Sequence, residues 1–127
     1  MAERNDDPRL KLRPQILIGN EIAMGPGKAA LLDAIGQTGS ISAAGRLLGM
    51  SYRRTWLLVD AMNRCWAEPL VETVTGGSRG GGARVTDAGR AVRADYAAWC
   101  ARLAAAAAGT APLLARLRPE PLPPAGH

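Results

Sequence analysis

The chain has 127 residues, with 16 lysines and arginines against 11 acidic residues and a net charge of +5 at pH 7. We expect one ordinary domain with short arms and no second, sensory domain. The excess positive charge favours an anionic partner such as nucleic acid or a membrane surface. Cys65 and Cys100 lack the spacing of a zinc site, and His127 is the single histidine, so we expect no metal, no cofactor and a reducing compartment.

Residues 1–13 alternate charges around no apolar core, which predicts a mobile N-terminal arm rather than a signal peptide. No uninterrupted apolar run reaches the roughly 20 residues of a membrane span. The sequence therefore predicts a cytoplasmic protein without a membrane partner.

Two short segments rich in isoleucine and leucine, 16–18 and 21–23, flank Gly19-Asn20. That pattern indicates a two-residue hairpin turn or one long bent strand. The segment 25–27 breaks this element, and its proline suits the first turn of a following helix. The first helix is predicted over about 28–37 from the inward spacing of its leucines and isoleucine, and it should end at Thr38-Gly39.

Residues 40–56 are typical of a helix-turn-helix: two short helices joined by a tight turn. Ser42 is placed to cap the first of these helices, predicted at about 43–48, and Ser51 to cap the second. Gly49 supplies the turn. The helix that Ser51 caps is the third helix of the domain. Its inward face carries Thr55, Val59 and Met62. The helix opens with Tyr52, Arg53 and Arg54.

Two adjacent arginines behind a serine cap favour DNA contact over a merely solvated helix start, because arginine can pair bidentately with guanine. Which of the two reads a base stays open. Tyr52 would contact the DNA backbone or pack on the turn, and Trp56 is expected in core or subunit packing rather than on DNA. Ser40 and Ser42 could bind phosphate at the preceding helix start. Lys28 could touch a phosphate or be solvated.

The β-branched, alternating residues 70–75 predict a half-exposed strand, and 83–85 resume as the return strand. The glycine-rich segment 76–82 between them would be the tip of a wing. Arg79 at this tip is expected to contact phosphate or the minor groove, the alternative being an exposed flexible loop. Because strand-type residues lie on both sides, the glycines match neither a P-loop nor a dinucleotide fingerprint.

Thr86 can cap a last long helix, and Asp87 in its first turn suits the helix dipole. An apolar seam of the heptad kind predicts that residues 87–108 form a dimerisation helix, the alternative being a helix folded back on its own domain. For residues 109–127 we expect a short turn and a disordered proline-rich tail. The seam consists of Val92, Tyr96, Trp99 and Leu103.

Over about residues 16–103 the chain resembles the DNA-binding domain of the bacterial molybdate-responsive regulators of the ModE family, which is related to the LysR-type winged helix. The resemblance implies a homodimer joined through N- and C-terminal helices, with the wing on the flanking backbone. Full-length members carry C-terminal oxyanion-binding domains that are not found here. Molybdate sensing is therefore assigned to no residue, and a separate effector-sensing protein is one further partner to consider. The resemblance rests on Gly-Ser-Ile-Ser at 39–42, Ser-Tyr-Arg-Arg-Thr-Trp at 51–56, Met62-Asn63, Pro69-Leu70-Val71-Glu72, Thr75-Gly76-Gly77 and Gly80-Gly81-Gly82.

Together these patterns predict a mainly α fold with a small β wing: a winged helix-turn-helix over residues 14–86 followed by the dimerisation helix. The predicted function is a homodimeric, sequence-specific transcription regulator on a pseudo-palindromic operator. An enzyme is not expected, because no nucleophile is paired with a base and Asp33, Asp60 and Asp95 fall on separate helices. The alternatives are a protein-interaction module and a non-specific DNA-compacting protein.

Overall fold

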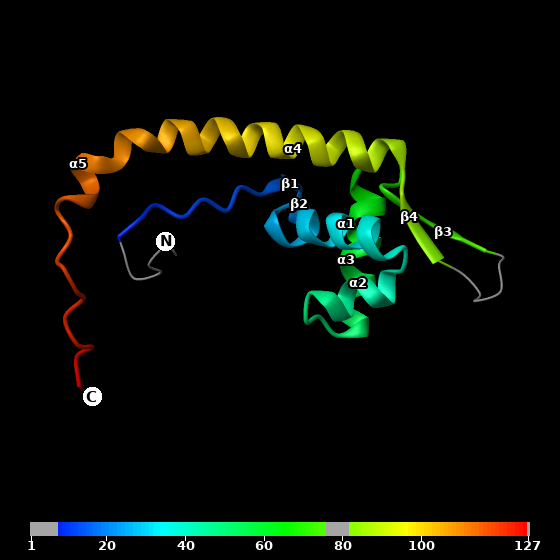
Figure 1. Ribbon diagram of the computed structural model, residues 1–127, viewed down its shortest axis with the longest axis horizontal. Helices are drawn as coiled ribbons and strands as arrows, with labels where there is room; N and C mark the ends of the chain where they lie inside the picture. Colours follow the sequence, from blue (N-terminus) through cyan, green and yellow to red (C-terminus); the bar gives the residue numbers. More distant parts are fainter. Residues whose placement is uncertain (1–7, 76–81, 127) are drawn as a thin grey trace.

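The structure is a computed structural model that describes residues 8–75 and 82–126. It is mainly helical, with two separate antiparallel two-stranded sheets. Helices α1, α2 and α3 gather into one body, the β3–β4 hairpin projects from one side, and α4 runs along the edge opposite α2 and beyond the body (Figure 1). The elements are β1 (Ile16–Ile18), β2 (Glu21–Met24), α1 (Pro26–Thr38), α2 (Ile41–Leu47), α3 (Tyr52–Cys65), β3 (Val71–Val74), β4 (Gly82–Val85), α4 (Asp87–Ala106), the 3₁₀ turn η1 (Ala107–Thr110) and α5 (Ala111–Leu114).

The N-terminal strands form a hairpin, which decides between the two alternatives left by the sequence. Ile18 pairs with Glu21 across the two-residue turn, where Gly19 has a φ of 59°. Proline stands in the first turn of α1, as predicted, and Gly39, with a φ of 69°, ends that helix. Left-handed φ values of this kind favour glycine.

The core lies between α1, α3 and the start of β3. Its largest fully buried side chains include Leu31, Leu32 and Ile35 of α1, Met62 of α3 and Leu70. The predicted inward face of α3 is confirmed, because Thr55, Val59 and Met62 are all buried.

The local signals around α2 and α3 are confirmed except at one helix start. The hydroxyl of Ser51 accepts a hydrogen bond from the amide of Arg54 at 3.1 Å, and Gly49 has a φ of 71°. The prediction that Ser42 caps α2 is wrong, because Ser40 is the cap and accepts from Ala43 N at 3.1 Å. Either serine has a suitable side chain. Ile41 is buried as the first helical residue, which places the helix start before Ser42.

Helix α4 begins at its predicted cap, where the Thr86 hydroxyl accepts from Gly89 N at 3.0 Å. Its apolar seam divides into two halves. Val92 packs against the core, and Tyr96 is buried with its hydroxyl donating to the Pro14 carbonyl at 2.8 Å. Trp99 and Leu103 are 58% and 39% exposed. The first half of the seam therefore folds back on its own domain, and the residues that the structure describes leave the second half uncovered.

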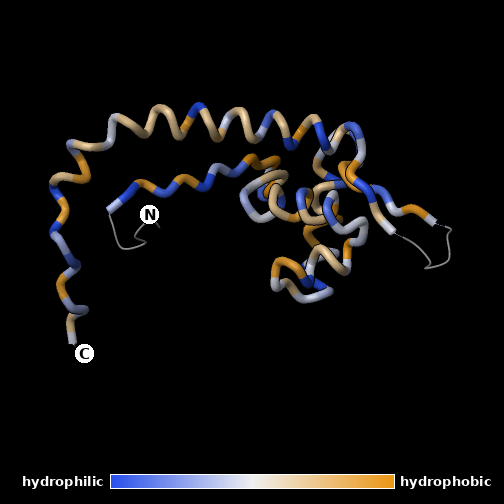
Figure 2. Tube along the Cα trace, in the orientation of Figure 1, coloured by the Kyte–Doolittle hydropathy of each residue, from blue (hydrophilic) through white to orange (hydrophobic). Residues whose placement is uncertain are grey.

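The far half of α4 is largely apolar along its length (Figure 2). By length and composition alone, the helical stretch Asp87–Leu114 would suffice to cross a membrane. The sequence expectation concerned an uninterrupted apolar run and is not contradicted, because this stretch includes charged residues such as Arg93 and Arg102. One such helix is weak evidence for a membrane protein, because the core helix of a soluble protein passes the same test.

The predicted short turn beyond residue 109 is confirmed as the end of η1 and α5. Residues 115–126 form neither helix nor strand and are exposed.

Candidate nucleic-acid interface

The first two turns of α3 carry the candidate site. Thr55 and Val59 turn inward, so Arg53 and Leu57, which are exposed, occupy the opposite side of the helix. The N-terminal end of α3 and the turn from α2 lie on the side of the body away from α4 (Figure 1). This arrangement leaves the helix start open to a large partner.

The charges on this surface are not neutralised from within the part of the chain that the structure describes. There, the exposed side chains of Arg53 and Arg54 make no hydrogen bond or ion pair. Four arginines elsewhere are engaged with carboxylates: Arg64 with Asp60 and Glu21, Arg84 with Glu72, Arg90 with Asp87, and Arg93 with Asp33. The two arginines of the α3 start are thus available to an external anion.

Arg46 is a further candidate that the sequence interpretation did not single out. It is exposed on the last turn of α2 and likewise makes no ion pair or hydrogen bond from its side chain to the described residues. Its position in the helix before the α3 turn is a signal that could have found it, since the first helix of a helix-turn-helix crosses the DNA backbone.

A cleft of about 250 Å³ separates the start of α2 from the β3–β4 hairpin. Trp56 forms part of its wall and is 37% exposed, so the alternative of core packing for this residue is wrong. Its ring lies 6.2 Å from that of Tyr52, at an interplanar angle of 59°. The hydroxyl-bearing residues of the cleft are Ser40, Ser42, Thr73 and Thr75. Serine and threonine hydroxyls beside a basic helix start can contact the phosphates of a bound duplex.

Lys28 is not placed as expected for a solvated or phosphate-binding residue. It stands in the first turn of α1 but is only 8% exposed. Burial lowers the pKa of its ammonium group, while the nearby Cys65 and Glu21 act in the opposite direction. The prediction of an accessible Lys28 is therefore wrong, because α1 packs its first turn against the rest of the fold and covers this side chain.

Cys65 lies beside Lys28 and Glu21 and contacts the glutamate. Its thiol donates to the Glu21 carboxylate at 3.6 Å, and burial, helped by that hydrogen bond, raises the pKa of the thiol. A raised pKa keeps the thiol protonated and lowers its reactivity.

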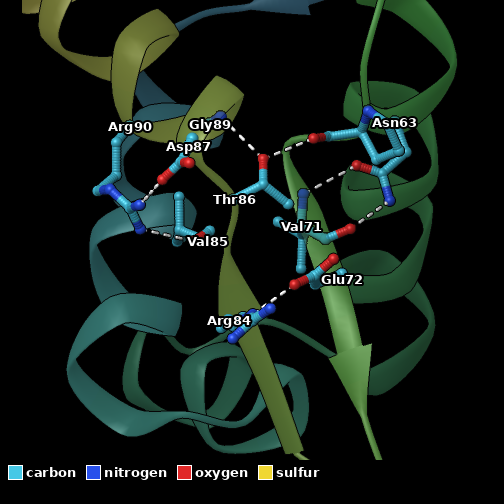
Figure 3. A network of polar contacts seen from close by, with 10 residues as sticks. Asn63, Val71, Glu72, Arg84, Val85, Thr86, Asp87, Gly89 and Arg90 are labelled. Atoms are coloured by element: carbon cyan, nitrogen blue, oxygen red, sulfur yellow. Dashed lines mark hydrogen bonds and ion pairs between the residues drawn. The ribbon is translucent and has the colours of Figure 1, made fainter.

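Asn63 fixes the hairpin to the end of α3, a role that the sequence interpretation did not assign. Its Oδ1 accepts from the backbone amides of Leu70 at 2.9 Å and Val71 at 3.1 Å, and its Nδ2 donates to the Val71 carbonyl at 2.9 Å. Thr86 adds a bond from its hydroxyl to the Pro69 carbonyl at 2.6 Å (Figure 3). The base of the hairpin is thereby held in one orientation to α3. Arg79, the expected contact at the hairpin tip, lies outside the described residues.

Taken together, the fold and site define a small, mainly helical domain with an exposed basic helix start and an adjacent hairpin. No protein-family model matches the chain. It is 52% identical over 75 residues to the molybdenum-pterin-binding protein MopB of Rhodobacter capsulatus, covering 59% of this chain and 28% of that protein. It is 42% identical over 76 residues to the molybdenum transport protein ModE of Azotobacter vinelandii, covering 60% of this chain and 28% of that protein.

A third relative is named for DNA binding. The chain is 40% identical over 65 residues to the DNA-binding transcriptional dual regulator ModE of Escherichia coli K12, covering 51% of this chain and 25% of that protein. The chain thus spans only about a quarter of the length of these relatives.

Proposed function

We propose that this protein is a sequence-specific DNA-binding transcription regulator, related to the ModE proteins, whose domain is a winged helix-turn-helix. In this assignment α3 is the recognition helix and the β3–β4 hairpin is the wing. The observation that carries the proposal is the pair of exposed arginines in the first turn of α3, whose side chains pair with no residue that the structure describes. The similarity to the DNA-binding transcriptional dual regulator of Escherichia coli supports it.

The proposed docking places the first two turns of α3 in the major groove, which is wide enough to admit an α-helix. Arg53 and Arg54 meet the DNA there, and Ser51 holds the helix start in place. Ser40, Ser42 and Tyr52 lie beside the cleft that receives the backbone. Arg79 reaches the flanking DNA from the wing.

The functional unit in this proposal is a homodimer joined through the far half of α4. Trp99 and Leu103 are the exposed members of the seam, and two copies could bury them against each other. Val92 and Tyr96 pack within their own domain, so in this proposal they hold α4 on the body and do not contact the partner. A two-fold dimer recognises half-sites about 34–36 Å, or a multiple, apart. In this proposal the protein is cytoplasmic and has no enzymatic activity, and a separate protein senses the effector.

The test is fluorescence anisotropy on a labelled duplex from the protein's own upstream region against a shuffled duplex at about physiological salt. A specific binder typically prefers its site by at least a thousandfold. The double variant R53A/R54A should lose both affinity and preference. The matched control R116A/R118A removes the same charge from the exposed residues after α5 and should keep the preference.

Two outcomes would contradict the proposal. Unchanged affinity and preference in R53A/R54A would show that α3 does not read DNA. Equal binding of both duplexes by the wild type would favour DNA compaction, and no binding would favour a protein-interaction module.

A further inference from the structure

We propose that base reading is divided between two residues of α3: Arg53 pairs with a guanine, and Leu57 contacts the methyl group of a thymine. Arg54 then binds the phosphate backbone. This inference rests on the proposed function and adds the base specificity of the same surface.

The helix geometry separates the two arginines. Successive residues turn by about 100°, and residues four apart return to within about 40° of one another. Buried Thr55, Val59 and Met62 fix the inward direction of α3. Arg53 and Leu57 therefore form one strip centred roughly opposite the core, which is the part of a recognition helix that enters a groove deepest.

Arg54 belongs to the flank of the helix. It lies about 100° further round than Arg53. Its charge is close enough to Lys28 of α1 to contribute to lowering the pKa of that ammonium group. A flank that faces the rest of the domain meets the groove wall rather than its floor, so Arg54 is placed for phosphate.

The strip also has a defined end. One turn after Leu57, Asp60 accepts a hydrogen bond from Arg64 at 2.8 Å, and Arg64 reaches Glu21 at 3.2 Å. These groups satisfy one another, so the unpaired reading surface is confined to the first two turns of α3.

The chemistry of Leu57 selects its target. It is 55% exposed and brings no hydrogen-bonding group. The C5-methyl group of thymine is the apolar feature of the major-groove base edges. Four residues of helix rise by about 6 Å, which corresponds to roughly two base-pair steps of 3.4 Å along the groove. The guanine and the thymine are therefore expected about two base pairs apart in each half-site.

The experiment first selects preferred duplexes from a random library with the full chain. In the best duplex each thymine is then replaced by deoxyuridine, which lacks the methyl group, and each guanine by 7-deazaguanine, which lacks the N7 acceptor. For the wild type, one deoxyuridine should weaken binding about fourfold, as for one lost apolar carbon. One 7-deazaguanine should weaken it at least about fivefold, as for one lost hydrogen bond.

Each protein variant should erase the matching DNA effect. L57A should become insensitive to deoxyuridine at that position, and R53A to 7-deazaguanine. R54A should bind all duplexes more weakly while keeping both sensitivities. The matched control L47A changes another leucine, 59% exposed on α2, and should behave as the wild type.

The result that overturns the inference is a preferred duplex in which no deoxyuridine or 7-deazaguanine weakens the wild type, or in which L57A and R53A keep those sensitivities. In that case the proposed function stands, because the duplex was selected by sequence. Failure to enrich any sequence from the library would instead refute the proposed function, and this inference with it.

Discussion

The contact between Gly45 and Thr55 sets how closely α2 can approach α3, and replacing Gly45 by alanine tests it. A Cβ atom at position 45 would lie 2.2 Å from the Thr55 hydroxyl oxygen and 3.0 Å from both of its side-chain carbons. Thr55 has no exposed surface, and its hydroxyl donates to the Ser51 carbonyl at 2.8 Å. The threonine therefore cannot move aside without breaking a buried hydrogen bond or displacing the core.

The expected net loss in the free energy of unfolding for G45A is about 2 kcal/mol. Inserting a methyl group into a packed core costs about 1–3 kcal/mol, and the collision with a whole buried side chain places this case near the upper value. Alanine offsets about 1 kcal/mol of that through its higher helix propensity. A net 2 kcal/mol lowers the folding equilibrium constant about 30-fold.

The assay is urea denaturation, in which G45A should lower the midpoint and leave the slope unchanged. The matched control is G36A in α1, where a Cβ would meet nothing within 4 Å. It should gain up to about 1 kcal/mol. In a double-mutant cycle, T55A should reduce the cost of G45A, because it removes the colliding hydroxyl oxygen and methyl group of Thr55. Stability of G45A at or above the wild type, or strict additivity with T55A, would refute the close-contact reasoning.

Three further predictions concern the hairpin anchor, the buried lysine and the N-terminal arm. N63A should lower the free energy of unfolding by about 3 kcal/mol, because it leaves the buried amides of Leu70 and Val71 without their acceptor. N63D keeps the acceptor oxygens and should lower it less. A loss below about 1 kcal/mol in urea denaturation of N63A would argue against the anchor. K28M should stabilise the fold at pH 7, because burial lowers the lysine pKa and the unfolded chain binds the proton more tightly. Wild-type stability should then rise relative to K28M as the pH approaches the ordinary lysine pKa of about 10.4, and a gap that widens instead would contradict this sign. Y96F should lose about 1 kcal/mol with the bond to the Pro14 carbonyl and should speed amide hydrogen exchange in residues 8–15; unchanged exchange there would show that the hydroxyl does not hold the arm.

The features that could be predicted from the sequence are those decided within a few residues. The Ser51 cap, the Thr86 cap and the glycine turns at Gly39 and Gly49 depend on local hydrogen bonds and backbone angles, and all are confirmed. The inward face of α3 follows from helical spacing alone, and it too is confirmed.

The features that could not be predicted depend on packing between distant segments. Lys28 follows a helix start in the sequence, and only the packing of α1 in the fold buries its side chain. Ser40 and Ser42 are equivalent as caps until the burial of Ile41 places the helix start. The sequence around Asn63 is that of an ordinary helical residue. Only the fold brings the backbone amides of Leu70 and Val71, seven and eight residues later, within hydrogen-bond distance of its side chain. In each of these cases, packing between distant segments decides a feature that the local sequence leaves open.

In the proposed dimer, α4 serves two purposes: its first half packs on its own domain, and its second half contacts the partner. The first half of α4 is tied to α1 by Arg93, whose Nε and Nη2 each lie 2.9 Å from a carboxylate oxygen of Asp33, and to the arm by Tyr96. A bidentate pair fixes the angle between two helices as well as their distance. The exposed half with Trp99 and Leu103 then extends from the domain as a continuation of the same helix. In the proposed dimer, the angle at the Asp33–Arg93 contact would therefore set the separation of the two α3 helices, and with it the spacing of the half-sites.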